Sequence, residues 1–80
     1  MSRARDVVDV VARALASRPD EVQVVELHRR GQAVVELTMA PGDLGRVIGR
    51  QGRTATAVRT LAAAAGELDG ERVTVDFRDD

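Results

Sequence analysis

Two glycines with an arginine between them form the part of this sequence best suited to chemistry. Gly49 and Gly52 stand three residues apart, with Arg50 and Gln51 between them and Arg53 immediately after. Glycine has no side chain, so it lets another molecule approach the main chain closely. An arginine-flanked turn at the start of a helix favours an anion such as phosphate. The spacing therefore predicts an anion-binding turn.

Apolar residues on both sides of this turn follow helical spacing. They are Leu44, Val47 and Ile48 before the turn, and Ala55, Val58, Leu61, Ala62 and Ala65 after it. The stretch of about 43–65 therefore predicts a short helix, a Gly-x-x-Gly turn and a longer helix. Asp43 is the expected N-cap of the short helix, and the longer helix is expected to stop at Gly66.

Commoner phosphate-binding motifs do not fit this stretch. A P-loop needs a glycine five residues before its Gly-Lys-Ser/Thr unit, but Val47 holds that position before Gly52, and Arg53 replaces the lysine. No Gly-x-Gly-x-x-Gly dinucleotide fingerprint occurs. What remains is Gly-x-x-Gly between two helices, the loop by which KH domains clamp a nucleic-acid backbone. Alone, such a match is usually only a turn, so the other elements must decide.

The rest of the chain predicts one more helix and three short strands. The helix covers about residues 3–17, and the strands cover about 22–28, 33–39 and 72–78. Ser2 is the expected N-cap of the first helix, and Gly31 suits a tight hairpin between the first two strands. His28 is expected to be a solvated residue at a strand end.

This order of elements, α-β-β-α-α-β, predicts a single domain over 1–80 with a two-layer α/β (α+β) sandwich. Three half-buried strands form a mixed sheet that needs one layer of helices to cover one face. The hairpin makes the first two strands antiparallel. The helical crossover then lays the last strand parallel to the second, at its free edge.

Charge is distributed unevenly along a chain whose net charge is only −1. All 12 basic residues are arginine. Four of them lie between residues 44 and 66, where there is no acid: Arg46, Arg50, Arg53 and Arg59. Positive charge is therefore concentrated around the glycine turn. The exclusive use of arginine in an alanine-rich chain is better explained by a GC-rich genome than by phosphate binding.

Several functional classes are disfavoured by composition. The chain has no cysteine, no run of about eighteen apolar residues and no recognisable signal peptide. We therefore expect a cytoplasmic protein with no membrane association. No nucleophile–base pair or metal-ligand cluster is visible in the sequence, so no enzymatic activity, cofactor or metal is expected.

The element order resembles the type II KH fold across nearly the whole chain. The segment Gly45-Arg-Val-Ile-Gly-Arg-Gln-Gly-Arg-Thr matches the KH signature of an aliphatic pair, glycine, a basic residue, any residue and glycine. More narrowly, the chain resembles the small bacterial KhpA-type KH proteins. That resemblance implies an RNA-binding protein that acts as an RNA chaperone or post-transcriptional regulator, with a link to cell-shape and cell-wall regulation. It also implies a homodimer, or a heterodimer with the larger KH- and R3H-containing protein KhpB.

The resemblance places single-stranded RNA along the glycine loop, with bases on an aliphatic floor. The expected RNA-binding residues are Arg46, Val47, Ile48, Gly49, Arg50, Gln51, Gly52, Arg53, Thr54, Val58 and Leu37. The single aromatic residue, Phe77, is expected in the core, which excludes an aromatic stacking platform.

A second interpretation stays open, namely a dimerisation module that has the KH fold but little nucleic-acid binding of its own. The basic residue at Arg50 favours RNA binding instead. The alanine run at 62–65 allows close approach of either the chain's own core or a second protein chain.

Overall fold

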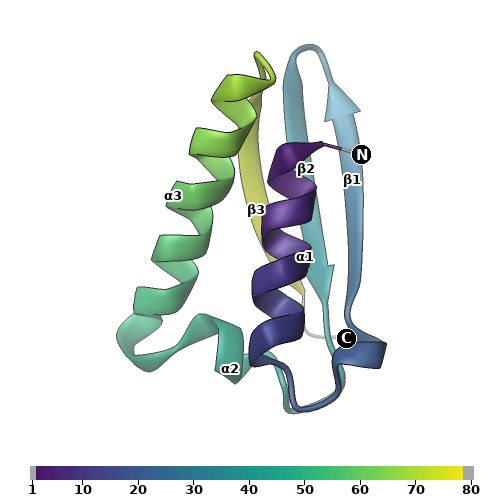
Figure 1. Ribbon diagram of the computed structural model, residues 1–80, viewed down its shortest axis with the longest axis vertical. Coiled ribbons are helices and arrows are strands. Elements are labelled where there is room, and N and C mark those ends of the chain that lie inside the picture. Colours follow the sequence, from purple (N-terminus) through teal and green to yellow (C-terminus); the bar gives the residue numbers. More distant parts are fainter. Residues whose placement is uncertain (1, 79–80) are drawn as a thin grey trace.

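The structure is a computed structural model that describes residues 2–78. Its helices are α1 (Arg3–Leu15), α2 (Gly45–Ile48) and α3 (Arg53–Leu68), and its strands are β1 (Gln23–Arg29), β2 (Gln32–Thr38) and β3 (Arg72–Arg78). Short 3-10 turns occupy Pro19–Glu21 and Arg50–Gly52. The helices lie on one side of the sheet, as Figure 1 shows. The predicted two-layer α+β sandwich is therefore confirmed.

The sheet has the order β1-β2-β3, with β2 in the centre. β1 pairs antiparallel with β2, and β3 pairs parallel with β2, as the hairpin and the helical crossover predict. Leu37 in β2 is opposite Val24 in β1 and Phe77 in β3. Because side chains alternate along a strand, these three residues face the helices together.

The hairpin between β1 and β2 turns at Arg30 and Gly31. Both have positive φ, at 48° and 76° respectively. Two successive residues with positive φ are typical of a type I′ turn, whose twist suits a two-residue hairpin. The predicted role of Gly31 is confirmed.

The core lies between the sheet and the two long helices, which run side by side across it (Figure 1). α1 buries Ala4, Val8 and Ala12, and α3 buries a second series of mostly small residues: Ala55, Val58, Ala62, Ala65 and Gly66. Small residues on both helices let their backbones approach the sheet and each other closely. Burying a valine or leucine side chain contributes about 1.5–3 kcal/mol. The largest fully buried side chains therefore contribute most to this core: Leu37, Val8, Val35, Val47 and Val58.

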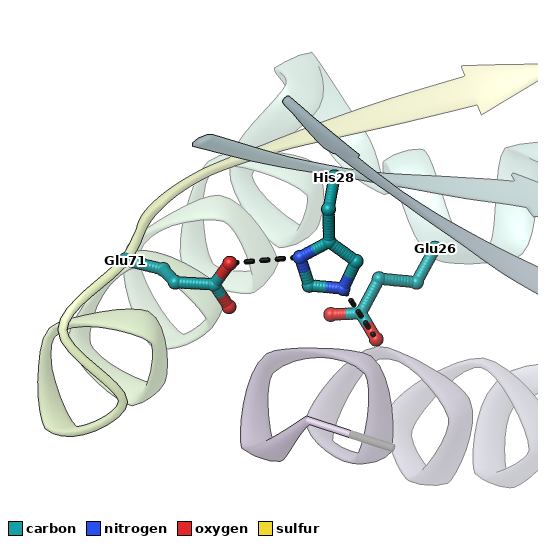
Figure 2. A group of neighbouring side chains, drawn as sticks. All are labelled: Glu26, His28 and Glu71. Atoms are coloured by element: carbon teal, nitrogen blue, oxygen red, sulfur yellow. Dashed lines mark hydrogen bonds and ion pairs between the residues drawn. The ribbon is translucent and has the colours of Figure 1, made fainter. Parts of the chain in front are cut away.

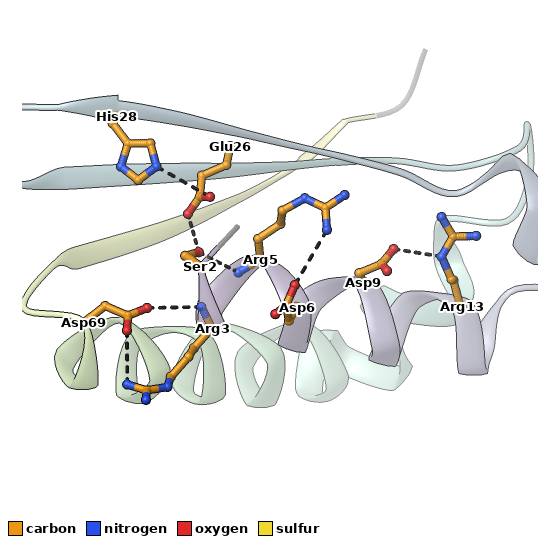
Figure 3. A network of polar contacts seen from close by, with 9 residues as sticks. All are labelled: Ser2, Arg3, Arg5, Asp6, Asp9, Arg13, Glu26, His28 and Asp69. Atoms are coloured by element: carbon orange, nitrogen blue, oxygen red, sulfur yellow. Dashed lines mark hydrogen bonds and ion pairs between the residues drawn. The ribbon is translucent and has the colours of Figure 1, made fainter.

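Polar contacts stabilise α1 at its first turn and along its exposed face (Figure 3). Ser2 caps the helix as predicted, because its hydroxyl accepts a hydrogen bond of 3.1 Å from the Arg5 backbone N–H. Arg13 Nε lies 2.8 Å from Asp9 Oδ1, one helical turn earlier. Such exposed pairs contribute less than about 1 kcal/mol each.

Two predicted helix ends are wrong, each because of a long-range contact. α1 stops at Leu15 rather than near residue 17, and the Ser17 backbone N–H binds the Asp43 carboxylate instead. α3 continues through Gly66 to Leu68. Gly66 is buried against β3, where a Cβ would lie 2.3 Å from Val73 Cγ2, so this glycine permits close packing rather than ending the helix.

Among the described residues, no helix is long and apolar enough to cross a membrane.

Candidate nucleic-acid interface

The glycine loop connects α2 to α3 at the lower end of the molecule in Figure 1. Gly49 follows α2 with φ 75° and ψ 175°, and Gln51 and Gly52 also have positive φ, at 57° and 71°. Such angles are costly for most residues and easy for glycine. The backbone geometry therefore requires glycine-like freedom at both predicted positions.

The two glycines nevertheless differ in what surrounds them. A Cβ on Gly49 would lie 2.4 Å from Thr54 Oγ1 and 2.8 Å from Thr54 Cβ, whereas a Cβ on Gly52 would meet no atom within 4 Å. Gly49 therefore lets the loop pack against the first turn of α3. Gly52 instead leaves open space beside the backbone.

The start of α3 carries positive potential that the protein does not neutralise. No side chain caps the helix at Gly52, so backbone N–H groups and the positive end of the helix dipole face the loop. Arg50 and Arg53 are both exposed. Within residues 2–78, neither has an acidic group within salt-bridge distance. This arrangement suits the binding of a phosphate group.

Two other arginines near the loop have partners of their own. Arg46 Nε lies 3.2 Å from Asp43 Oδ1. The Arg59 guanidinium stacks 4.8 Å from the ring centre of Phe77, which is half-buried. These two cations are therefore partly engaged within the protein.

The aliphatic residues predicted for the site lie at different depths. Leu37 and Val47 have no exposed surface and Val58 is 2% exposed, so all three belong to the core. Ile48 and Thr54 are half-buried, and Gln51 is exposed. Of the predicted aliphatic residues, Ile48 is therefore the one that presents a surface beside the loop.

A buried carboxylate that sequence reasoning misassigned holds this end of the molecule together. Asp43 is 3% exposed and does not cap α2 with its side chain. It accepts hydrogen bonds from the Ser17 hydroxyl at 2.8 Å and from the backbone N–H groups of Ser17 and Arg18 at 3.0–3.1 Å. Asp43 therefore ties the segment after α1 to the start of α2.

These donors also affect the acidity of Asp43. The hydrogen bond from the Ser17 hydroxyl lowers the pKa of Asp43, and the backbone N–H groups of Ser17 and Arg18 lower it further. The ionised carboxylate is thus the form that the fold stabilises. A single local pattern could not have revealed this contact, since 26 residues separate the partners.

Comparison with known proteins places this chain in a family. Residues 5–77 match the KH domain of KhpA/KhpB. The RNA-binding protein KhpA of Caldanaerobacter subterraneus subsp. tengcongensis is 45% identical over 72 residues, which are 90% of this chain and 96% of that protein. The RNA-binding protein KhpA of Leifsonia xyli subsp. xyli is 49% identical over 70 residues, covering 88% of this chain and 90% of the relative.

A solved structure shows the same fold in a larger protein. The crystal structure of Aquifex aeolicus Era bound to GDP·AlF4⁻ superposes with a TM-score of 0.64 at 20% identity. The match covers 92% of this chain and 29% of the Era chain. The likeness concerns the fold alone. The family match and the KhpA relatives, by contrast, span nearly the whole chain, and the protein therefore belongs to the KhpA/KhpB KH-domain family.

Proposed function

We propose that this protein binds single-stranded RNA, holding the sugar–phosphate backbone at the glycine loop. Its relatives named RNA-binding protein KhpA support RNA as the ligand. The observation that carries the proposal is the open backbone at Gly52, flanked by the exposed Arg50 and Arg53 at the uncapped start of α3. No bond is made or broken at such a site, so the protein acts as a binding module rather than an enzyme.

Each part of the site then has a physical role. A phosphate approaches Gly52 and the first turn of α3, and Arg50 and Arg53 neutralise its charge. Gln51 and Thr54 offer polar groups beside the loop, while Arg46 contributes charge that it shares with Asp43. Ile48 contacts a base, and the buried Leu37, Val47 and Val58 support it from below. Contacts of this kind give affinity with little base discrimination.

The family resemblance extends the proposal to biological role. By that resemblance, the protein acts in the cytoplasm as an RNA chaperone or post-transcriptional regulator and influences cell shape and the cell wall. A small binding site at one loop suits this role, because a chaperone must bind many sequences weakly and release them.

We also propose that the protein self-associates, or pairs with KhpB, through the outer face of α3. Four exposed residues repeat there at spacings of four, three and four: Ala57, Leu61, Ala64 and Leu68. Leu61 is 52% exposed and Leu68 is 73% exposed. This apolar stripe has the spacing by which two helices pack together. Of the alanine run, Ala62 and Ala65 pack into the chain's own core, and Ala64 belongs to the stripe.

The RNA proposal is tested by adding one negative charge at the open glycine. Gly52→Asp places a carboxylate where the phosphate is expected, so binding of a short unstructured RNA should be lost in fluorescence anisotropy. Gly70→Asp is the matched control, because Gly70 has the same φ of 71° and equally open surroundings at the other end of α3. Circular dichroism establishes that both variants are folded.

Two outcomes would contradict the RNA proposal. Equal RNA binding by folded Gly52→Asp and by the parent protein would exclude the loop as the site. Equal loss in Gly52→Asp and Gly70→Asp would show that total charge, rather than the loop, controls binding. Absence of RNA binding by the parent protein itself would instead favour the alternative of a dimerisation module with little RNA binding.

A further inference from the structure

Three ionisable side chains converge at the opposite end of the molecule from the glycine loop (Figure 2). Glu26 and His28 lie two residues apart on β1, and Glu71 lies just before β3. His28 Nδ1 is 2.8 Å from Glu71 Oε2, and His28 Nε2 is 3.5 Å from Glu26 Oε1. One ligand atom from each of the three residues fits within a group no more than 4.8 Å across.

The hydrogen bonds around this cluster fix the direction of each group. In the neutral imidazole, an N–H on Nδ1 that donates to Glu71 leaves a lone pair on Nε2. That lone pair faces an oxygen of Glu26, whose side chain is only 10% exposed. The other Glu26 oxygen accepts a hydrogen bond from the Ser2 hydroxyl (Figure 3). The acceptors His28 Nε2 and Glu26 Oε1 therefore face each other across a short gap. A positive charge between them would stabilise this arrangement.

The separation of the two acceptors suits a metal ion. Zinc binds imidazole nitrogen and carboxylate oxygen at about 2.0–2.2 Å, so two ligands of a tetrahedral ion stand about 3.4 Å apart. The His28 Nε2–Glu26 Oε1 distance of 3.5 Å is close to this value. In many metal sites, the ring nitrogen of histidine that does not bind the metal is hydrogen-bonded to a carboxylate. Glu71 occupies this position beside His28 Nδ1.

We propose that His28 Nε2 and the Glu26 carboxylate bind a divalent transition-metal ion of the Zn²⁺ class. Water completes the coordination shell on the exposed side, and Glu71 is a positioning residue that holds the imidazole in the correct tautomer. A site with one imidazole and one carboxylate favours zinc-like ions over calcium or magnesium, which prefer oxygen ligands alone.

The local electrostatics agree with this geometry. The hydrogen bond to Glu71 raises the pKa of His28 despite some desolvation, and the negative charges of Glu71 and Glu26 raise it further. The same carboxylates favour a metal ion at Nε2, which binds in competition with a proton there. The sequence did not suggest this site, because 43 residues separate His28 from Glu71.

A bound ion would be held on β1 by two side chains that hydrogen bonds link to two other segments of the fold. Glu26 and His28 belong to β1, Glu71 fixes the turn before β3, and Ser2 links Glu26 to the start of α1. Because only the folded chain orients the His28 ring with Glu71 and the Glu26 carboxylate with Ser2, metal binding should stabilise the folded state. The glycine loop lies at the other end of the sandwich (Figure 1), so we expect a metal ion at this cluster to leave RNA binding at the loop unchanged.

The first test is thermal unfolding of the untagged, chelator-treated protein with increasing ZnCl₂. At free zinc about ten times the dissociation constant, the melting temperature should rise by about 5–10 °C. His28→Gln and Glu26→Gln should each abolish the zinc-induced rise. Glu71→Gln should weaken zinc affinity by about 10–100-fold, because its amide oxygen keeps the hydrogen bond but loses the charge.

Glu36→Gln is the matched control, since Glu36 lies on the adjacent strand but is directed to the opposite face of the sheet and pairs with Arg78. Its zinc response should equal that of the parent. No zinc-dependent rise in the parent protein, or an equal rise in His28→Gln, would overturn the proposal. Comparing the rise in each variant, rather than its absolute melting temperature, removes any effect of the substitution on basal stability.

Nuclear magnetic resonance gives a second, independent readout. His28 is the only histidine in the chain, so its ring nitrogens are assigned without ambiguity. Zinc should shift the Nε2 resonance while Nδ1 stays protonated and bound to Glu71. A zinc effect on Nδ1 instead, or no effect on either nitrogen, would contradict the proposed coordination.

Discussion

The two ends of the sandwich carry opposite charge: exposed arginines at one end and clustered carboxylates at the other. At the glycine loop, Arg50 and Arg53 lie beside an uncapped helix start without acidic partners in the described part of the chain. At the hairpin end, the carboxylates of Glu26 and Glu71 surround one exposed histidine. A net charge of −1 therefore conceals one end suited to an anion and another suited to a cation. For a small domain, the placement of charges says more about ligands than their sum.

The two glycines of the loop are needed for different reasons. Gly49 is needed by the fold, because Thr54 occupies the space next to it, whereas Gly52 leaves space that the fold does not use. The motif Gly-x-x-Gly thus contains one packing glycine and one glycine open to a ligand. Substitutions can separate the two roles.

The largest expected effect is that of Gly49→Ala on stability. The new Cβ must displace Thr54 and hold φ at 75°, so we expect a loss of about 3 kcal/mol in the free energy of unfolding. Gly52→Ala has only the conformational cost, about 1 kcal/mol. Urea unfolding of the two variants measures the difference. Equal losses would show that the contact with Thr54 does not distinguish the glycines.

The next effect concerns the carboxylate that holds the glycine-loop end together. Asp43→Asn should lower the melting temperature by about 5–10 °C at pH 7, because it removes the charge that binds the Ser17 and Arg18 donors. The folded pKa of Asp43 is lowered, so its contribution is complete above the unfolded pKa of about 4. That contribution is lost as the pH falls through the lower, folded value.

The parent and Asp43→Asn should therefore differ fully at pH 5–7 and converge below about pH 4. Melting temperatures measured from pH 7 down to pH 2.5 check this. Ser17→Ala is a further variant to compare, since it removes only the hydroxyl donor and should lower the melting temperature less than Asp43→Asn. A gap between parent and Asp43→Asn that stays constant down to pH 2.5 would mean that the carboxylate charge is not what stabilises the contact.

The sequence predicted the features that depend on neighbouring residues. The alternation in β2, the hairpin at Gly31 and the Ser2 cap each follow from a local pattern, and the structure has all three. Strand order and direction followed as well, because a hairpin and a helical crossover leave few topologies for three strands.

Features that depend on distant partners were missed. Nothing near Asp43 indicates that Ser17 will bind its carboxylate, and nothing near Gly66 indicates that Val73 will pack on it. The same holds for His28 and Glu71, which meet only when β1 and β3 lie in one sheet. Of the candidate RNA site, the loop residues follow from the motif, whereas the burial of Leu37 and Val58 required the packed structure.

Salt dependence tests whether the glycine-loop end is the anion-binding end. With about three phosphates neutralised on single-stranded RNA, log K should fall against log salt with a slope near −2. Affinity should therefore drop about 16-fold between 50 and 200 mM salt. Anisotropy titrations at four salt concentrations give the slope. A slope near zero would mean that phosphate contacts do not drive binding.

The smallest expected effect is the difference in RNA affinity between variants of two arginines, one with an acidic partner and one without. Arg50→Ala removes an exposed cation without an acidic partner among residues 2–78, and it should weaken RNA binding about 5-fold at 0.1 M salt, equally for all sequences. Arg46→Ala removes a cation that already pairs with Asp43 at 3.2 Å, so it should weaken binding less. The salt slope should also fall by about 0.7 in Arg50→Ala and by less in Arg46→Ala. If both variants lose affinity equally, pairing with Asp43 does not limit what Arg46 offers to RNA.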